Sequence, residues 1–250
     1  YQDIPLNDRK VYQMLARGET GAVFQLESGG MTKLITQMFA DIDTLPDDRL
    51  DECFERLIAA VALYRPGPMD YIPNYLDGMR DVHNIKYLTP ELEDILRPTY
   101  GVIVYQEQVM HIVQKLAGYS LGRADLVRKA MGKKKTKIMD AEKVVFIYGN
   151  KAAFEAGKDQ NYAPGCVANG ISEEIATQIW SQMEKFGLYA FNRSHSACYA
   201  FLSCITAYMR CYWPAEFYAA MCNAFIANSD KLHSYFSQAT HLGIKLLSPD

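Results

Sequence analysis

The sequence predicts a mainly α-helical protein with a few short strands. Three observations support this: apolar residues recur at steps of three and four in several segments, strand-like runs are few and short, and the composition is that of an ordinary globular chain. Of 250 residues, 49% are hydrophobic and 22% are charged, which supports a sizeable core. This balance excludes a disordered chain, collagen and a coiled coil.

Each helix is expected where one face of the segment is apolar. Three clear stripes cover residues 109–116, 171–186 and 201–212. Further helices are predicted over residues 7–16, 47–63, 123–131, 136–156 and 229–241, the last opening with a Ser cap position and closing at Gly243. Strands are expected only at 22–26, 101–105 and 244–247. We expect a helical domain over residues 1–230, followed by a C-terminal helix and short strand over 231–250 that lead to a next domain.

Two segments between these elements have an unusual composition. Arg65-Pro66-Gly67-Pro68 is expected to be a rigid turn, because two prolines flank a glycine. Residues 41–56 carry seven acids, which is typical of a solvated helix face and its lead-in.

The six cysteines form no Cys-x-x-Cys pair, and they are interpreted as reduced thiols. No secretory leader is recognised, and the apolar segment 196–209 is shorter than the roughly 18 apolar residues that a membrane span needs. We therefore expect a cytoplasmic chain without membrane association. The first residue is not Met and the last two are Pro-Asp, so a piece of a longer protein is expected.

The strongest local charge signal is a basic window over residues 126–139. It carries six Lys and Arg and no acid, a charge of +6, so that the net charge of -3 leaves -9 for the rest of the chain. Arg128, Lys129 and Lys133 fall near the end of a predicted helix, where several cations project from a short stretch. A triphosphate needs such an arrangement, with Arg binding bidentately and Lys acting as a point charge. The alternative is a solvated basic turn with an Asp125–Lys129 helix pair.

A second signal precedes the predicted helix that contains the 201–212 stripe. Asn192 or Ser194 is expected to cap this helix, whose free N–H groups would attract an anion. His195 and Tyr199 are four residues apart and share one helix face, suited to stacking on a base and contacting a phosphate. The alternatives are a capped core helix with a half-buried histidine, and a Ser-His hydrolase, which lacks a Gly-x-Ser-x-Gly motif.

Metal ligation is not predicted for this chain. Asp41 and Asp43 form its one Asp-x-Asp pair, but they lie within the acidic run and are interpreted as surface residues. The five histidines match no metal-ligand spacing.

Six motifs in a fixed order carry a resemblance to a known family. They are Gly-Ala-Val-Phe-Gln-Leu-Glu-Ser (21–28), Ala-Leu-Tyr-Arg-Pro-Gly-Pro-Met (62–69), Tyr-Gly-Val-Ile-Val-Tyr-Gln-Glu-Gln-Val-Met (100–110), Arg-Lys-Ala-Met-Gly-Lys-Lys (128–134), Tyr-Ala-Phe-Asn-Arg-Ser-His (189–195) and Pro-Ala-Glu-Phe (214–217). In this order the chain resembles the fingers domain of the bacterial DNA polymerase III alpha subunit, of polymerase family C. The family commonly has Arg-Arg where this chain has Arg128-Lys129.

The resemblance implies a role in template-directed DNA synthesis, with binding of the incoming deoxynucleoside triphosphate (dNTP) and of primer–template DNA. The residues implied for the dNTP and the nascent base pair are Arg128, Lys129, Lys133, Asn192, Ser194, His195 and Tyr199. Those implied for DNA are Arg65, Lys134, Lys135 and Arg193. The family holds Mg²⁺ with palm carboxylates upstream of this region, so the segment alone is expected to be inactive. Other replicase subunits are expected to bind outside it.

One alternative of a different class remains open at this point. A non-catalytic helical module that binds nucleic acid or a protein partner would use the same basic stretch. It would bind DNA with a salt dependence set by its phosphate contacts and would not respond to added nucleotide.

Overall fold

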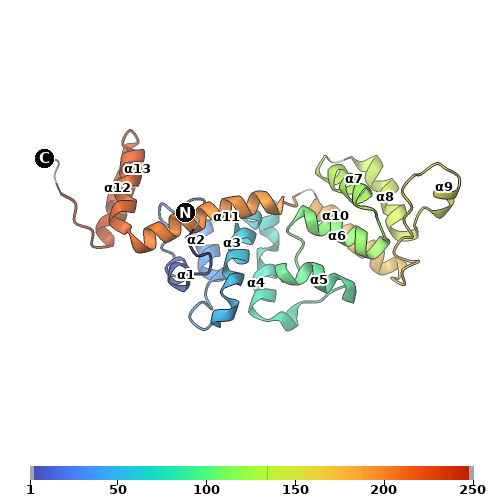
Figure 1. Cartoon of the computed structure of the whole chain (residues 1–250), viewed down its shortest axis with the longest axis horizontal. Coiled ribbons are helices and arrows are strands. Elements are labelled where there is room, and N and C mark those ends of the chain that lie inside the picture. Colours follow the sequence, from blue (N-terminus) through green and yellow to red (C-terminus); the bar gives the residue numbers. More distant parts are fainter. Residues whose placement is uncertain (1–2, 134, 188, 248–250) are drawn as a thin grey trace. The chain divides into compact units, whose positions relative to one another are not determined.

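The computed structural model describes residues 3–133, 135–187 and 189–247. In these ranges the chain is almost entirely helical, as Figure 1 shows. The α-helices are α1 (Arg9–Ala16), α2 (Gly29–Met38), α3 (Asp51–Leu63), α4 (Ile72–Arg80), α5 (Glu93–Leu96), α6 (Gln106–Ala117), α7 (Leu121–Gly132), α8 (Thr136–Tyr148), α9 (Lys151–Glu155), α10 (Glu173–Gly187), α11 (Arg193–Tyr212), α12 (Pro214–Ala224) and α13 (Ser229–His241). Short 3₁₀ turns span Asp47–Arg49, Pro68–Tyr71, Val82–Asn84, Pro90–Leu92 and Arg97–Thr99. The mainly α-helical prediction is confirmed.

The chain divides into two compact units. One contains residues 62–196, and the other combines residues 1–61 with 197–250. The two boundaries fall inside α3 and α11. Each unit has a core of its own.

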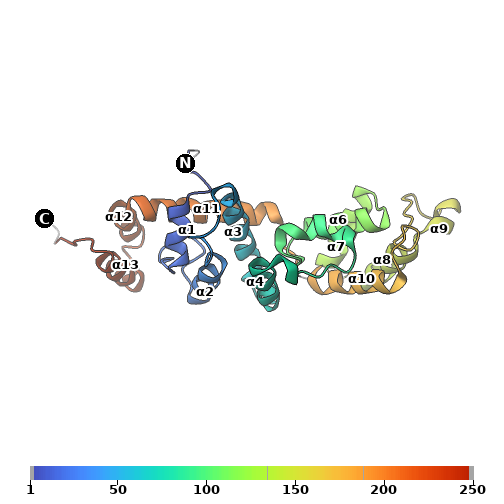
Figure 2. The same ribbon diagram turned by 90° about the horizontal axis from the view of Figure 1, so that it is seen from below.

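The unit of residues 62–196 is built around a bundle of α6, α7, α8 and α10, which Figures 1 and 2 both show packed together. Trp180 and Phe146 are fully buried at its centre, with ring centroids 5.2 Å apart. The apolar stripe predicted at 109–116 lies on α6, and its Ile112, Val113 and Leu116 are fully buried in the same core. Burying these stripes provides most of the stabilisation that holds such helices in place.

The other unit packs α1, α2 and α3 around Tyr12 and Phe39, whose ring centroids lie 4.9 Å apart. Arg56 on α3 is only 2% exposed, and the Asp41 carboxylate pairs with it at 2.6 Å. The acidic run is therefore not merely a solvated face, because Asp41 neutralises a buried guanidinium. In the same unit α12 and α13 lie side by side (Figures 1 and 2) and share a small apolar cluster containing Tyr218 and Tyr235.

The helix predictions agree with the structure in position but not in every boundary. The helix expected over 136–156 is interrupted, because α8 ends at Tyr148 and the residue that caps it, Gly149, has a φ of +79°. A side chain there would place its Cβ 2.2 Å from the carbonyl oxygen of Pro164, so the chain passes too closely for any residue but glycine. For α13 the cap is Asn228 rather than the predicted serine, with its side chain accepting from the Lys231 N–H at 3.0 Å.

The three strand predictions are wrong. Residues 22–26 form successive turns, in which Ala22 and Gln25 take positive φ values. In 101–105 only Tyr105 is paired, through a parallel bridge to Phe191, and 244–247 has no ladder partner in the described part of the chain. A strand is defined by its partner, and none of these runs has a ladder partner among the described residues.

Candidate functional site

The bridge between Tyr105 and Phe191 brings two helix N-termini together within the unit of residues 62–196. The Phe191 N–H donates to the Val104 carbonyl at 3.1 Å, and the Gln106 N–H donates to the Phe191 carbonyl at 2.9 Å. Gln106 is the first residue of α6, and α11 begins two residues after Phe191. The motifs at 100–110 and 189–195 therefore meet at one junction.

At this junction the cap of α11 follows the sequence prediction. The Asn192 side-chain oxygen accepts from the His195 N–H at 2.8 Å, which satisfies one of the donors at the start of the helix. Its amide nitrogen donates to the Glu107 carboxylate at 3.0 Å. The Arg193 N–H points at the same carboxylate, 3.2 and 3.1 Å from its two oxygens.

Glu107 is therefore the residue that sequence reasoning missed. The sequence predicts that the N-terminus of α11 attracts an anion, and in the structure the anion at that position is a side chain of the chain itself. The signal was present, because Glu107 is an acid in the first turn of α6 within the 100–110 motif. Its partner lies 85 residues further on, so the contact leaves no local pattern.

Arg128 on α7 reaches the same junction. Its Nη1 donates to the Gln106 side-chain oxygen at 3.1 Å, while Nε and Nη2 donate to Asp125 at 2.9 and 2.7 Å. Gln106 in turn donates to the Ala190 carbonyl at 3.1 Å. The basic window and the cap of α11 are therefore linked through two consecutive residues, Gln106 and Glu107.

Three lysines of the window, Lys129, Lys133 and Lys135, line a pocket of about 410 Å³ beside α7. Lys129 pairs with Asp125 at 2.6 Å, and its hydrogen bond, followed by that of Arg128, lowers the pKa of the Asp125 carboxyl. Lys133 and Lys135 are exposed on the same pocket. The Asp125–Lys129 pair expected for a solvated basic turn is present. It provides an acidic partner for Lys129 but not for Lys133 or Lys135. Lys134 lies outside the described residues.

Arg65 has a different setting from the one expected of a DNA contact. Its guanidinium lies 4.0 Å from the centre of the Phe191 ring, and it donates to the carbonyls of Ala62 and Tyr189, both at 2.9 Å. Burial lowers the pKa of this guanidinium. Arg65 therefore stabilises the turn that leads into α11. The Pro-Gly-Pro segment that follows Arg65 is predicted to be a turn, and Gly67 there has a φ of +100°.

The remaining predicted residues lie along the start of α11. Ser194, Arg193 and His195 are exposed in its first turn, and the His195 ring meets the Phe191 ring edge-on with centroids 5.3 Å apart. Tyr199 belongs to the other unit, where its ring packs against Phe24 at 5.5 Å. The junction between α6 and α11 thus brings together five residues: Arg128, Gln106, Glu107, Asn192 and Arg193. Tyr199 does not belong to this group, because its ring packs against Phe24 in the other unit.

Comparison with known proteins identifies the domain. A family model described as the bacterial DNA polymerase III alpha subunit finger domain matches residues 1–153, which is more than half of the chain. The chain belongs to this finger-domain family. The resemblance inferred from the six motifs is confirmed.

Individual relatives match this chain over nearly its whole length. The DNA polymerase III alpha subunits of Borreliella burgdorferi and Thermus aquaticus are both 42% identical over the full chain, and that of Escherichia coli is 42% identical over 99% of it. The aligned region is 19 to 20% of each relative, so the chain spans about one fifth of their length.

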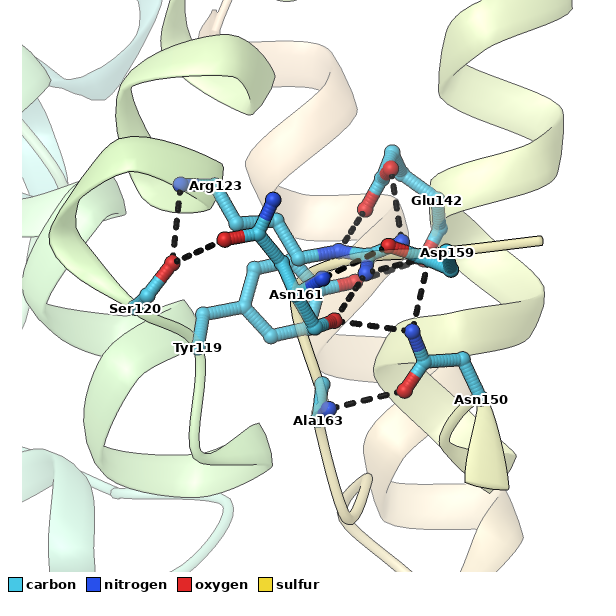
Figure 3. Close-up of polar contacts among 8 residues, drawn as sticks. All are labelled: Tyr119, Ser120, Arg123, Glu142, Asn150, Asp159, Asn161 and Ala163. Atoms are coloured by element: carbon cyan, nitrogen blue, oxygen red, sulfur yellow. Dashed lines mark hydrogen bonds and ion pairs between the residues drawn. The ribbon is translucent and has the colours of Figure 1, made fainter. Parts of the chain in front are cut away.

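A buried ionic cluster fixes α7, the helix of this finger domain that carries Arg128 (Figure 3). Arg123 is 7% exposed and forms a two-pronged contact with Glu142 of α8, at 2.9 and 3.0 Å. Its Nη1 donates to Asp159 and to the Asn161 carbonyl, both at 2.8 Å.

Hydrogen bonds within the cluster stabilise the charged forms of Arg123 and Asp159. Burial opposes the charge of Arg123, but the hydrogen bonds to Glu142 and Asp159 outweigh it and raise the pKa of the guanidinium. The Asn161 N–H is the main cause that lowers the pKa of Asp159 to about 2, and Arg123 and Asn150 assist. The cluster holds α7, α8 and the 159–163 segment in register without using the exposed cations.

Two further findings bear on the finger domain. In the ranges that the structure describes, no three His, Cys, Asp or Glu side chains gather as metal ligands. Nor is any described helix both long and apolar enough to span a bilayer.

Proposed function

We propose that this chain binds the triphosphate of the incoming dNTP and contacts the nascent base pair during template-directed DNA synthesis by a replicative polymerase. One observation carries the proposal: Arg128 and the N-terminus of α11 are linked through consecutive residues of α6. These two features, each predicted to bind an anion, lie 64 residues apart in the sequence. Membership of the finger-domain family supports the same role.

The chain's own acids occupy the positions that phosphate oxygens would take. Asp125 accepts from Arg128 and Lys129, and Glu107 accepts from the α11 N-terminus. A triphosphate carries several oxyanions, and it competes for guanidinium and N–H donors with single carboxylates. In this proposal phosphate binding replaces these internal contacts, and Lys133 adds a point charge at the neighbouring pocket.

The other side chains of the region have supporting roles. Ser194, His195 and Tyr199 contact the base pair or sugar from α11, and Lys135, Lys134 and Arg193 neutralise phosphates of the primer–template. Arg65 acts on DNA only through the turn it braces, since its donors contact the Ala62 and Tyr189 carbonyls. Such phosphate contacts make DNA affinity fall with salt.

The decisive experiment replaces Arg128 with alanine in a complete polymerase subunit that contains this chain. Loss of a charge-assisted contact to the transferred nucleotide costs about 1.5–3 kcal/mol, so incorporation efficiency is expected to fall by about 10- to 150-fold. The matched control is Lys115→Ala on α6, which removes an exposed cation whose partner is Asp94. Equal incorporation by the Arg128→Ala variant and the wild type would exclude Arg128 from the nucleotide site.

A second experiment separates this role from that of a non-catalytic nucleic-acid-binding module, which the exposed lysines of the 410 Å³ pocket also suit. In the complete subunit, a photoreactive dNTP should crosslink near Arg128 only when primer–template is present. Crosslinking that ignores the templating base, together with unchanged DNA affinity on adding dNTP, would favour the module. The 250-residue chain alone is expected to extend no primer, because the resemblance assigns the metal-binding carboxylates to the palm.

A further inference from the structure

A second pocket lies in the unit formed by residues 1–61 and 197–250, and none of its lining residues is among those assigned above. It has a volume of about 530 Å³, within the range of small-molecule sites. Its lining comes from the turn after α1, the start of α2, the end of α11 and the last turns of α13. The lining residues are Gly18, Glu19, Thr20, Gly21, Glu27, Thr32, Arg210, Ser237, Gln238, His241 and Leu242.

Arg210 is the one buried charge in this lining. Its side chain is only 6% exposed. The Nε atom donates to the Tyr218 hydroxyl at 3.1 Å, and that hydroxyl donates to Gln238 at 3.0 Å. This hydrogen-bonded chain fixes the plane of the guanidinium at the wall of the pocket.

The guanidinium has one loosely held counter-ion in the described part of the chain. Glu19 lies 3.5 Å from Nη1, longer than the roughly 2.7–2.9 Å of a charge-assisted hydrogen bond. The other oxygen of Glu19 makes a shorter contact with Arg17, at 2.5 Å. The Nη2 atom has no acceptor among the described residues, and it remains accessible from the pocket. Buried charges in proteins are normally paired and hydrogen-bonded.

We propose that this pocket binds a carboxylate group of a compact ligand, which completes the coordination of Arg210. A planar carboxylate matches the Nη1 and Nη2 edge of a guanidinium with two parallel hydrogen bonds. The hydroxyls of Thr20 and Ser237 supply further neutral contacts at the wall.

The charge of the lining favours one carboxylate over a polyphosphate. Glu19 and Glu27 line the same pocket, so its formal charge with Arg210 is negative. Their cationic neighbours, Arg17 at 2.5 Å and Lys231 at 3.9 Å, already offset these acids in part. Each additional negative charge on a ligand would meet these acids, whereas a single carboxylate is neutralised by Arg210.

The carboxylate has two sources with the same chemistry: a free small acid, or the C-terminus of a peptide. The test uses the Nε–H nuclear magnetic resonance signal of Arg210 in the 250-residue chain, assigned by its loss in Arg210→Lys. The probes are sodium acetate, triglycine, triglycinamide, inorganic phosphate and sodium chloride at equal ionic strength. Acetate and triglycine should shift the signal and saturate at millimolar concentration, with triglycinamide and chloride leaving it in place.

Two variants keep the test independent of protein stability. Arg210→Lys retains the charge but loses the planar fork, and amide signals lining the pocket should report acetate binding weakened at least about tenfold. In Gly21→Ala the new Cβ would lie 2.0 Å from the Gln238 side-chain oxygen, so Gln238 must move and alter the pocket while Arg210 remains. The control Gly29→Ala meets no atom within 4 Å and should bind like the wild type.

The outcomes separate clearly. Saturable binding of acetate that Gly21→Ala weakens and Gly29→Ala preserves supports the site. Tighter binding of triglycine than acetate then identifies a peptide terminus, and equal or weaker binding identifies a small free acid. The proposal is overturned when chloride shifts the signal as far as acetate does, when phosphate binds more tightly than acetate, or when Arg210→Lys retains full acetate affinity.

Discussion

Replacing Arg123 with methionine tests whether the buried ionic cluster holds the helix that carries the basic window. Methionine keeps most of the length of the side chain but removes every donor. Glu142 is 11% exposed, so its carboxylate would lose both hydrogen bonds in a nearly dry environment. Breaking a buried pair in this way costs about 3–5 kcal/mol, a large part of the roughly 5–15 kcal/mol that stabilises a typical domain.

The assay is urea unfolding followed by circular dichroism, with hydrogen exchange of α7 and α8 to locate the loss. Lys115→Met is the matched control: it also removes a cation, but its pair with Asp94 is 39% and 76% exposed, so the expected loss is below about 1 kcal/mol. The double variant Arg123→Met/Glu142→Leu should recover part of the stability, because it removes the nearly buried Glu142 charge; Asp159 loses its cation too, but it is 25% exposed and keeps the hydrogen bonds from Asn150 and the Asn161 N–H. A loss below about 1 kcal/mol in the single variant, or no recovery in the double one, would refute this account.

Three further predictions concern acids at or near the site. Asp159 has its pKa lowered to about 2, so its stabilisation is complete above about pH 4 and disappears as the pH falls towards 2; the stability difference between wild type and Asp159→Asn, from urea unfolding, should narrow over that interval, and a constant difference would contradict it. Glu107→Gln should tighten pyrophosphate binding about two- to fivefold, measured calorimetrically, because a charge at the α11 N-terminus is removed; weaker binding would contradict this. Asp125→Asn should strengthen binding of short single-stranded DNA and steepen its salt dependence, because Arg128 and Lys129 lose their acid; an unchanged salt slope would place both cations off the DNA path.

The sequence by itself determined where most helices lie. An α-helix closes its hydrogen bonds within four residues, so apolar spacing and caps such as Asn192 are visible locally. The basic window at 126–139 is equally local, because it is a matter of composition. The order of six motifs was enough to indicate the family without any coordinates.

Only the tertiary structure decided which distant residues share a site. Glu107 meets Asn192 across 85 residues, and Arg65 meets Tyr189 across 124; neither contact has a sequence pattern because both depend on how helices pack. The failed strand at 22–26 has the same cause, since strand formation requires a partner that the local sequence does not contain. Local hydrogen bonds are encoded in neighbouring residues, whereas ion pairs, strand partners and pockets depend on chain segments that only folding brings together.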